Sequence, residues 1–286
     1  MSDPDRVEAD ELRYDTVTFL SDYGLDDEFV GVVKSVIRDL ARHVTVIDLS
    51  HGIAPHDVRA GALLLARSVQ YVAGGVLLAV VDPGVGTDRR LLAVDCEPAT
   101  LIGPDNGLLA PAVAMLGGPR RVVSITSAEH RLSAPGSTFA GRDVLAPAAA
   151  HLAGGGGLAE LGEPVDPASL VPGVLGLPRP LEGGAIEADV WWVDRFGNCQ
   201  LNCGPDELAA AGATPGTAVE VLIGDRAKSA RWVAAYADAR PAELVLLVDS
   251  YGLLALALDR ESAALEYGLT AGSTVVLRPP GATVPR

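Results

Sequence analysis

The sequence GVLLAVVDPGVGTDRR, residues 75–90, joins a strand pattern to a charged, glycine-rich loop. Its first six residues, Gly75–Val80, form an apolar run with the length and composition of a buried strand. Asp82 follows, and the next eight residues hold one proline, two glycines and two arginines. Because glycine lets a backbone turn tightly or approach a ligand, the loop predicts one of two things. It is either a charged surface turn or a ligand site where Asp82 and Arg89 act together.

Strand and helix patterns alternate on both sides of this run. Strands are expected at residues 16–20, 44–50, 75–81 and 121–126, and helices at 27–41, 55–72, 107–116 and 141–153. The segments at 91–96 and 101–107 are expected to form a hairpin-like pair or two strands. Alternation of this kind predicts an α/β domain whose central sheet is mostly parallel and is covered by helices on both faces.

The pattern changes in the second half of the chain. Four consecutive glycines at 154–157 and a proline-rich segment at 165–180 predict a linker. Short strand patterns separated by turn residues follow and predict a smaller all-β, barrel-like domain. The expected organisation is a disordered tail at 1–15, an α/β domain at 16–165, a linker at 166–183 and a β-barrel domain at 184–286.

The composition limits the class of protein. The chain is 49% hydrophobic and 21% charged, and its formal net charge is −15. This acidity disfavours nucleic acid and anionic membranes as partners, because phosphate binding needs a basic surface. No apolar run approaches the roughly 20 residues of a membrane span, and the acidic N-terminus lacks a signal-peptide pattern. We therefore expect a cytoplasmic protein.

Several common sites are not predicted. The three cysteines, Cys96, Cys199 and Cys203, are an odd number without the spacing of a disulfide framework. No histidine or further cysteine lies near Cys199 and Cys203 in the sequence, so we expect no metal site there. The chain also lacks the dinucleotide fingerprint, the P-loop and the G-x-S-x-G motif, which disfavours NAD, ATP and an α/β-hydrolase.

Polar side chains follow four of the expected strands, in the segments SDYGLDDE (21–28), SHGIAPHD (50–57), DPGVGTDRR (82–90) and GPDNG (103–107). Ligands of open α/β sheets bind beyond the carboxyl ends of the strands, so we expect one shared pocket. In it, Asp22 and Asp27 can accept hydrogen bonds from sugar hydroxyls or an ammonium group, and His56 can pack against a sugar. Asp27 fits equally well as a cap of the following helix.

The second half offers two comparable turns. VDRFGNCQLN (193–202) places Asp194, Phe196 and Asn198 at a strand end, and DSYG (249–252) follows another apolar run. The donors and acceptor of an asparagine amide match the edge of an adenine. A structural turn explains Asn198 equally well.

Six segments together resemble one family. In chain order they are SDYGLDDEFVGVVKSVI, IDLSHGIAPHDVRAGALLL, VDPGVGTDRRLLAV, GPDNGLL, STFAGRD and DRFGNCQLN. They are similar to the S-adenosylmethionine (SAM) hydroxide adenosyltransferases, also called S-adenosyl-L-methionine hydrolases (adenosine-forming), which are relatives of fluorinase and chlorinase. The resemblance covers residues 16 to about 275.

The resemblance implies an enzyme that displaces L-methionine from the ribose 5′-carbon of SAM with a water-derived hydroxide, which gives adenosine. It implies a homotrimer whose ligand lies between the α/β domain of one subunit and the barrel domain of its neighbour. It implies no metal and no separate cofactor.

Residue roles follow from the same resemblance. Asp82 and Arg89 match two members of the family's water-activating set, and Asp22 matches the residue that holds the ribose hydroxyls. The methionine part of SAM is assigned to Asp27, Asp194, Ser250 and Tyr251, and the adenine to Asn198. The expected binding set also includes His56, Gly141 of STFAGRD and Phe196 of DRFGN.

One position departs from the family pattern. The hydrolases typically carry histidine where this chain has Ala140. Three explanations compete: a substitution engineered to weaken catalysis, a natural variant that is slower or uses His51 or His56 as the base, and a pocket that only binds. Positioned acid–base groups contribute about 10²–10⁴-fold to rates, so the effect can be large.

Two other functions stay open at this point. A halogenase would use chloride in place of hydroxide. Gly141 would tolerate chloride, but halogenases carry tyrosine at the position of Asp82, and a carboxylate repels a halide. A non-catalytic protein that binds SAM or adenosine is the second alternative, and the product formed from SAM separates all three.

Overall fold

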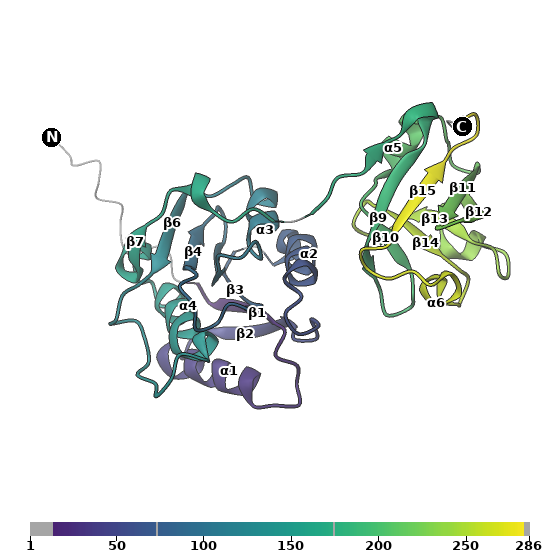
Figure 1. Cartoon of the computed structure of the whole chain (residues 1–286). Coiled ribbons are helices and arrows are strands. Elements are labelled where there is room, and N and C mark those ends of the chain that lie inside the picture. The colour runs from purple at the N-terminus through teal and green to yellow at the C-terminus, as the bar shows by residue number, and fades with distance from the viewer. Residues whose placement is uncertain (1–13, 73, 174, 283–286) are drawn as a thin grey trace. The chain divides into compact units, whose positions relative to one another are not determined.

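The computed structural model describes residues 14–72, 74–173 and 175–282. The chain divides into two compact units, residues 1–175 and 176–286 (Figure 1). The tail predicted at 1–15 lies, up to residue 13, outside the described residues. In the described part of the predicted linker, Pro167–Ser169 form a 3₁₀ turn (η4) and Arg179–Pro180 form a short strand, β8.

The N-terminal unit is built on a seven-stranded mixed sheet with the order β2-β1-β3-β5-β4-β6-β7. Its strands are β1 (Thr16–Ser21), β2 (Thr45–Ser50), β3 (Val76–Val80), β4 (Leu91–Asp95), β5 (Thr100–Pro104), β6 (Arg121–Ile125) and β7 (Gly162–Pro164). The pairings from β2 to β5 are parallel, and those from β5 to β7 are antiparallel. The direction changes because a tight turn after Asp95, closed by the Cys96 N–H bond to the Ala99 carbonyl (2.9 Å), returns the chain as a hairpin.

Strand β3 is buried on both faces, as its unbroken apolar sequence predicts. Val76, Leu78 and Val80 belong to the core on one side of the sheet, and Leu77 and Ala79 belong to the core on the other. Alternate residues of a strand point to opposite faces, so a strand covered on both sides is apolar throughout.

Four helices cover the two faces of this sheet: α1 (Phe29–Leu40), α2 (Val58–Ser68), α3 (Ala110–Met115) and α4 (Ala146–Ala153). Helices α1 and α4 pack on one face and α2 and α3 on the other (Figure 1). The α/β prediction is therefore confirmed for this unit. Among the described residues, no helix is long and apolar enough to cross a bilayer.

The helix expected at 141–153 starts as one turn of π-helix, η2 (Gly141–Leu145), before it becomes α4. Pro147 is one cause of the irregular start, because it has no N–H to donate to the Asp143 carbonyl one turn earlier. That carbonyl accepts a bond from the N–H of Leu132 instead (2.8 Å). The helix start is thereby attached to the loop that precedes it.

The C-terminal unit is a closed seven-stranded barrel. Its strands are β9 (Ile186–Val193), β10 (Cys199–Leu201), β11 (Ala218–Ile223), β12 (Arg226–Trp232), β13 (Val245–Val248), β14 (Leu254–Ala257) and β15 (Thr274–Arg278). Closure comes from the pairing of β10 with β9, and β8 pairs with the start of β9 at Ile186 and Glu187. Ile186, Ala188 and Val190 alternate into the barrel core. Two short helices, α5 (Pro205–Ala210) and α6 (Ala263–Tyr267), complete the unit, and the barrel-like prediction is confirmed.

Candidate functional site

A cavity of about 240 Å³ opens at the carboxyl ends of β1 and β3 in the N-terminal unit. It brings together five residues that the sequence analysis singled out, namely Asp22, His56, Asp82, Ala140 and Gly141. They come from loops after three parallel strands and from the start of η2, which is the edge of the sheet where a shared pocket was expected.

Asp82 and Arg89 form a two-pronged ion pair at this cavity. Arg89 Nε donates to both carboxylate oxygens of Asp82 at 2.9 Å, and Arg89 Nη2 donates to Oδ2. Their side chains are only 6% and 16% exposed, so water screens the pair weakly. The guanidinium thereby sets the plane of the carboxylate.

The loop between the two residues is folded by its own turns. Val85 N–H bonds to the Asp82 carbonyl (3.2 Å), and the Thr87 hydroxyl bonds to the Gly84 carbonyl (2.7 Å). A Cβ at Gly84 would lie 3.1 Å from Arg89 Cδ, so the glycine leaves room for the arginine to fold back. Of the two readings of this loop, the structure favours an inward pair over an exposed charged turn.

The GPDNG loop supports the same strand end. Asn106 Nδ2 donates to the carbonyl of Val81 (2.8 Å), directly before Asp82. Arg90 Nε donates to Asp105 (2.8 Å), and Arg90 Nη1 reaches Ser169 Oγ (2.9 Å). The two neighbouring arginines therefore have different roles. Arg89 pairs with Asp82 at the cavity, and Arg90 holds the GPDNG loop through Asp105.

A backbone N–H group orients the side chain of Asp22. Its Oδ2 accepts the N–H of His56 at 2.8 Å, and His56 has a φ of 69°. A positive φ is uncommon for a residue other than glycine, and such strain collects at ligand sites. The residue with this unusual φ is the one whose N–H bonds to the Asp22 carboxylate.

Tyr23 is a cavity residue that the sequence analysis did not single out. Its ring packs edge-on against Phe139 (centroids 5.7 Å apart) and tilts against Phe29 (5.5 Å). A Cβ at Gly141 would lie 2.2 Å from the Tyr23 hydroxyl oxygen, so only glycine there admits the phenol. Burial, and then the charge of Asp22, raises the pKa of Tyr23 well above its usual value, so the phenol stays a hydrogen-bond donor.

The signal for Tyr23 was present in the segment SDYG, where it follows Asp22, but an aromatic residue after a strand is common in cores. Other lining residues that pattern reasoning missed are Phe29, Pro55, Val80, Val85, Thr138 and Phe139.

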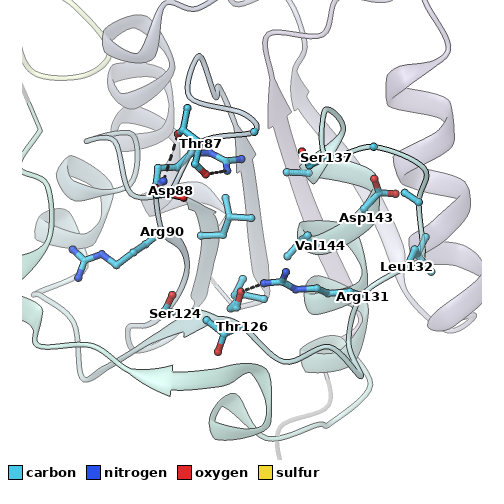
Figure 2. A pocket seen from close by; sticks show the side chains of 17 residues that line it. Thr87, Asp88, Arg90, Ser124, Thr126, Arg131, Leu132, Ser137, Asp143 and Val144 are labelled. Carbon is cyan, nitrogen blue, oxygen red and sulfur yellow. Dashed lines mark hydrogen bonds between the residues drawn. The ribbon is translucent and has the colours of Figure 1, made fainter.

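Ala140 borders a second, larger cavity of about 600 Å³ (Figure 2). Arg89 lines this second cavity and Asp82 lines the first, so the ion pair stands between the two. Figure 2 shows Thr87 and Arg131 around the larger space, with Arg131 bonded to the carbonyl of Ile125 (2.6 Å). Because its side chain is a single methyl group, Ala140 takes up little space in either cavity.

Two other predicted residues lie outside the small cavity. Asp27 is exposed and does not line it. It does not cap α1 either, because that helix is preceded by Glu28 with no side-chain cap bond. His51, one proposed substitute base, is buried with its Nδ1 bonded to Ser21 Oγ (2.7 Å) and its Nε2 3.2 Å from Asp48. His51 has a structural role, and His56 is the histidine that lines the cavity.

In the C-terminal unit, Asp194 organises the turn between β9 and β10. Its Oδ1 accepts the N–H groups of Phe196 (2.8 Å) and Asn198 (2.9 Å), and its Oδ2 accepts Asn198 Nδ2 (2.7 Å). Phe196 is 77% exposed at the tip. Asn198 therefore lies in a structural turn, which was one of its two interpretations. The turn carries the exposed ring of Phe196 and the oriented side-chain amide of Asn198.

The turn after β13 is built in the same way. Asp249 Oδ1 accepts the N–H groups of Tyr251 (2.8 Å) and Leu253 (3.1 Å), and Ser250 is exposed. Gln200 Nε2, from β10, donates to Asp249 Oδ2, so the two turns lie next to each other in the barrel. Burial, followed by the charges of Asp194 and Asp249, raises the pKa of Tyr236.

The three cysteines are unreactive thiols. All three are buried free thiols, and burial raises the pKa to about 11 for Cys96 and about 12 for Cys199 and Cys203. They remain protonated at neutral pH and are poor nucleophiles or metal ligands.

Comparisons with known proteins agree with one another. The profile of the SAM hydroxide adenosyltransferase N-terminal domain matches residues 17–162, and that of the C-terminal domain matches 188–276. The (R)-S-adenosyl-L-methionine hydrolase of Salinispora tropica is 42% identical over 256 residues, which cover 90% of this chain and 95% of that protein. The fluorinase of Actinoplanes sp. is 27% identical and covers 91% and 96% of the two chains. The crystal structure of an uncharacterized conserved protein from Thermotoga maritima matches with a TM-score of 0.85 and 30% identity, over 92% of this chain and 99% of that one.

Proposed function

Since this chain belongs to the SAM hydroxide adenosyltransferase family, we propose that it hydrolyses S-adenosyl-L-methionine to adenosine and L-methionine. The observation that carries the proposal is the Asp82–Arg89 pair at the edge of a small cavity that also contains Asp22. The pair offers a carboxylate to a water molecule, and Asp22 offers one to ribose hydroxyls.

The leaving group needs little assistance from the protein. Water oxygen forms a bond to the ribose 5′-carbon while the carbon–sulfur bond breaks, and sulfur leaves as a neutral thioether. The water gives up one proton, which the Asp82 carboxylate accepts. What the site must supply is an oriented, partly deprotonated water, so Asp82 accepts its hydrogen bond while Arg89 fixes the carboxylate.

Charge favours the substrate in this cavity. SAM carries a sulfonium cation, and the lining includes the carboxylates of Asp22 and Asp82, of which only Asp82 is paired with an arginine. Two carboxylates in the cavity lining attract a cation and repel a halide ion. Hydroxide is therefore favoured over chloride as the nucleophile, which agrees with the lower identity to fluorinase.

The oriented turns of the C-terminal unit supply the rest of the proposed site. We assign the methionine part to Asp194, Ser250 and Tyr251, together with Asp27, and the adenine to Asn198, with Phe196 exposed for stacking. We propose a homotrimer in which these turns come from a neighbouring subunit, with no metal or separate cofactor in the reaction. The buried free thiols fit a cytoplasmic location.

Product analysis tests the function. The full chain is incubated with SAM, with and without chloride, and the products are separated by chromatography. Adenosine in both conditions is the expected result. Chloroadenosine would identify a halogenase, and tight binding of SAM without turnover would leave a binding protein.

Subunit mixing tests the trimer. Asp82→Asn and Asp194→Ala variants are each expected to be weakly active, and co-refolded mixtures are expected to regain activity if one site uses both subunits. A mixture that is no more active than its components would place the two residues in one subunit's site.

A further inference from the structure

Away from the cavity, three side chains that commonly bind metals converge in the N-terminal unit. His130 lies in the loop after β6, His151 lies in α4, and Glu160 lies in the 3₁₀ turn η3 (Leu158–Leu161). One ligand atom from each lies within 4.8 Å of the others. None of the three residues lines the cavity that holds Asp82.

The distances suit a transition-metal ion. His151 Nε2 lies 3.0 Å from Glu160 Oε2, and the rings of His130 and His151 are 4.0 Å apart at 37°. Metal–ligand bonds of about 2.0–2.2 Å at tetrahedral angles separate neighbouring ligand atoms by about 3.3 Å. The pair of His151 and Glu160 already has nearly this spacing, and the ligand atom of His130 lies within 4.8 Å of both.

The backbone fixes the central ligand. A Cβ at Gly156 would lie 2.1 Å from His151 Cε1, so the imidazole occupies space that only glycine leaves. The carbonyl of Gly157 is 3.2 Å from His151 Nε2, and the N–H of Gly157 donates to Glu160 Oε2 (3.3 Å). The glycine run that breaks the chain's strand–helix pattern thus shapes a pocket around two of the three ligand groups.

A plain ion pair explains His151 and Glu160 but not His130. The ring of His130 lies 4.0 Å from that of His151 at 37°, so a third group that commonly binds metals stands beside the pair. Glu160 is 60% exposed, and the cluster opens to a surface cavity of about 480 Å³ that Glu129 also lines. Solvent can therefore supply the remaining ligands.

We propose that His130, His151 and Glu160 bind one divalent transition-metal ion, of which Zn²⁺ is the best match to two imidazoles and a carboxylate. The ion would bind between His151 Nε2 and Glu160 Oε2, which lie 3.0 Å apart. It ties the loop after β6 to α4 and η3, so its role is to stabilise the N-terminal unit. The proposal is independent of the reaction at Asp82.

Titration with Zn²⁺ tests the site. The full chain is treated with a chelator, transferred to a non-coordinating buffer at pH 7.5, and titrated calorimetrically with zinc chloride. One ion per chain is expected, with an affinity at least tenfold weaker in His130→Ala and in Glu160→Gln. Thermal unfolding followed in parallel should show a rise in Tm with Zn²⁺ for the parent and a smaller rise for both variants.

His43→Ala is the matched control, because His43 lies in the same unit but bonds to the carbonyl of Ala153 (3.0 Å). It should bind zinc as the parent does. Circular dichroism establishes that each variant is folded before titration. The proposal is overturned if the parent shows no saturable binding, or if His130→Ala and Glu160→Gln bind as tightly as the parent.

Discussion

Asp82 and Arg89 are seven residues apart in sequence, and Arg89 Nε lies 2.9 Å from both carboxylate oxygens of Asp82 across a loop that turns at Gly84. The carboxylate lines the smaller cavity and the guanidinium lines the larger one. A nucleophilic water held by this pair would stand where the two spaces meet.

Asp82→Asn should lower kcat for adenosine formation by about 10²–10⁴-fold, because an amide holds water but accepts its proton poorly. KM for SAM should change little. Asp88→Asn, on the exposed part of the same loop, is the control and should behave as the parent. Steady-state kinetics by chromatography measures both. A kcat within threefold of the parent would remove Asp82 from the mechanism.

Ala140→His should raise kcat, by about tenfold or more, since Ala140 borders both cavities and a new imidazole there can take a proton from the water. Ala140→Gln fills similar space without a base and should not raise it. The pH–rate profile of the histidine variant should gain a limb near the pKa of an imidazole, about 6.5. Equal rates for all three would show that Asp82 and Arg89 need no third group.

Tyr23→Phe removes one hydroxyl from the cavity and keeps the ring contacts with Phe29 and Phe139. A lost hydrogen bond of about 0.5–1.5 kcal/mol in the transition state lowers kcat by about 2- to 13-fold. KM should be nearly unchanged. The exposed Tyr71→Phe is the control. If kcat is unchanged while Tm falls, the Tyr23 hydroxyl contributes to stability and not to the reaction.

Gly141→Ala should destabilise the N-terminal unit by about 1–3 kcal/mol, because the added Cβ meets the Tyr23 hydroxyl at 2.2 Å. Gly136→Ala, where no atom lies within 4 Å, should be close to neutral. The double variant Tyr23→Phe/Gly141→Ala should recover part of the loss, which a double-mutant cycle of unfolding free energies measures. Additive losses would mean that the two residues do not touch.

Some parts of the fold and of the site could be predicted from the sequence, and particular residues show which. The unbroken apolar run of β3 correctly predicted a strand buried on both faces, and the turn residues after residue 184 predicted a barrel. Residues 91–96 and 101–107 were predicted as a hairpin-like pair or two strands, and β4 and β5 form the antiparallel hairpin. The sequence left both alternatives open because the two strands are as apolar as parallel ones. Tyr23 was missed because a side chain's direction after a strand depends on the space left by Gly141, which is distant in sequence.

The barrel carries a pH-sensitive ion pair far in sequence from the proposed water site. Arg231 Nε and Nη2 bond to the two oxygens of Glu243 (2.9 and 2.8 Å), and the N–H of Arg240 adds a third bond (2.9 Å). The Arg231 bonds, then the Arg240 bond, lower the pKa of Glu243 from its usual 4.5 to about 2. A pKa lowered in the folded state gives stability that is present above 4.5 and is lost as pH falls toward 2.

Glu243→Gln should therefore lower Tm at pH 7 and make Tm less dependent on pH between about 4.5 and 2. The exposed Glu182→Gln is the control and should follow the parent's pH dependence. Thermal unfolding of the full chain, followed by circular dichroism at several pH values, measures the slopes. A Glu243→Gln slope equal to the parent's would show that the ion pair does not contribute to the acid sensitivity of the barrel.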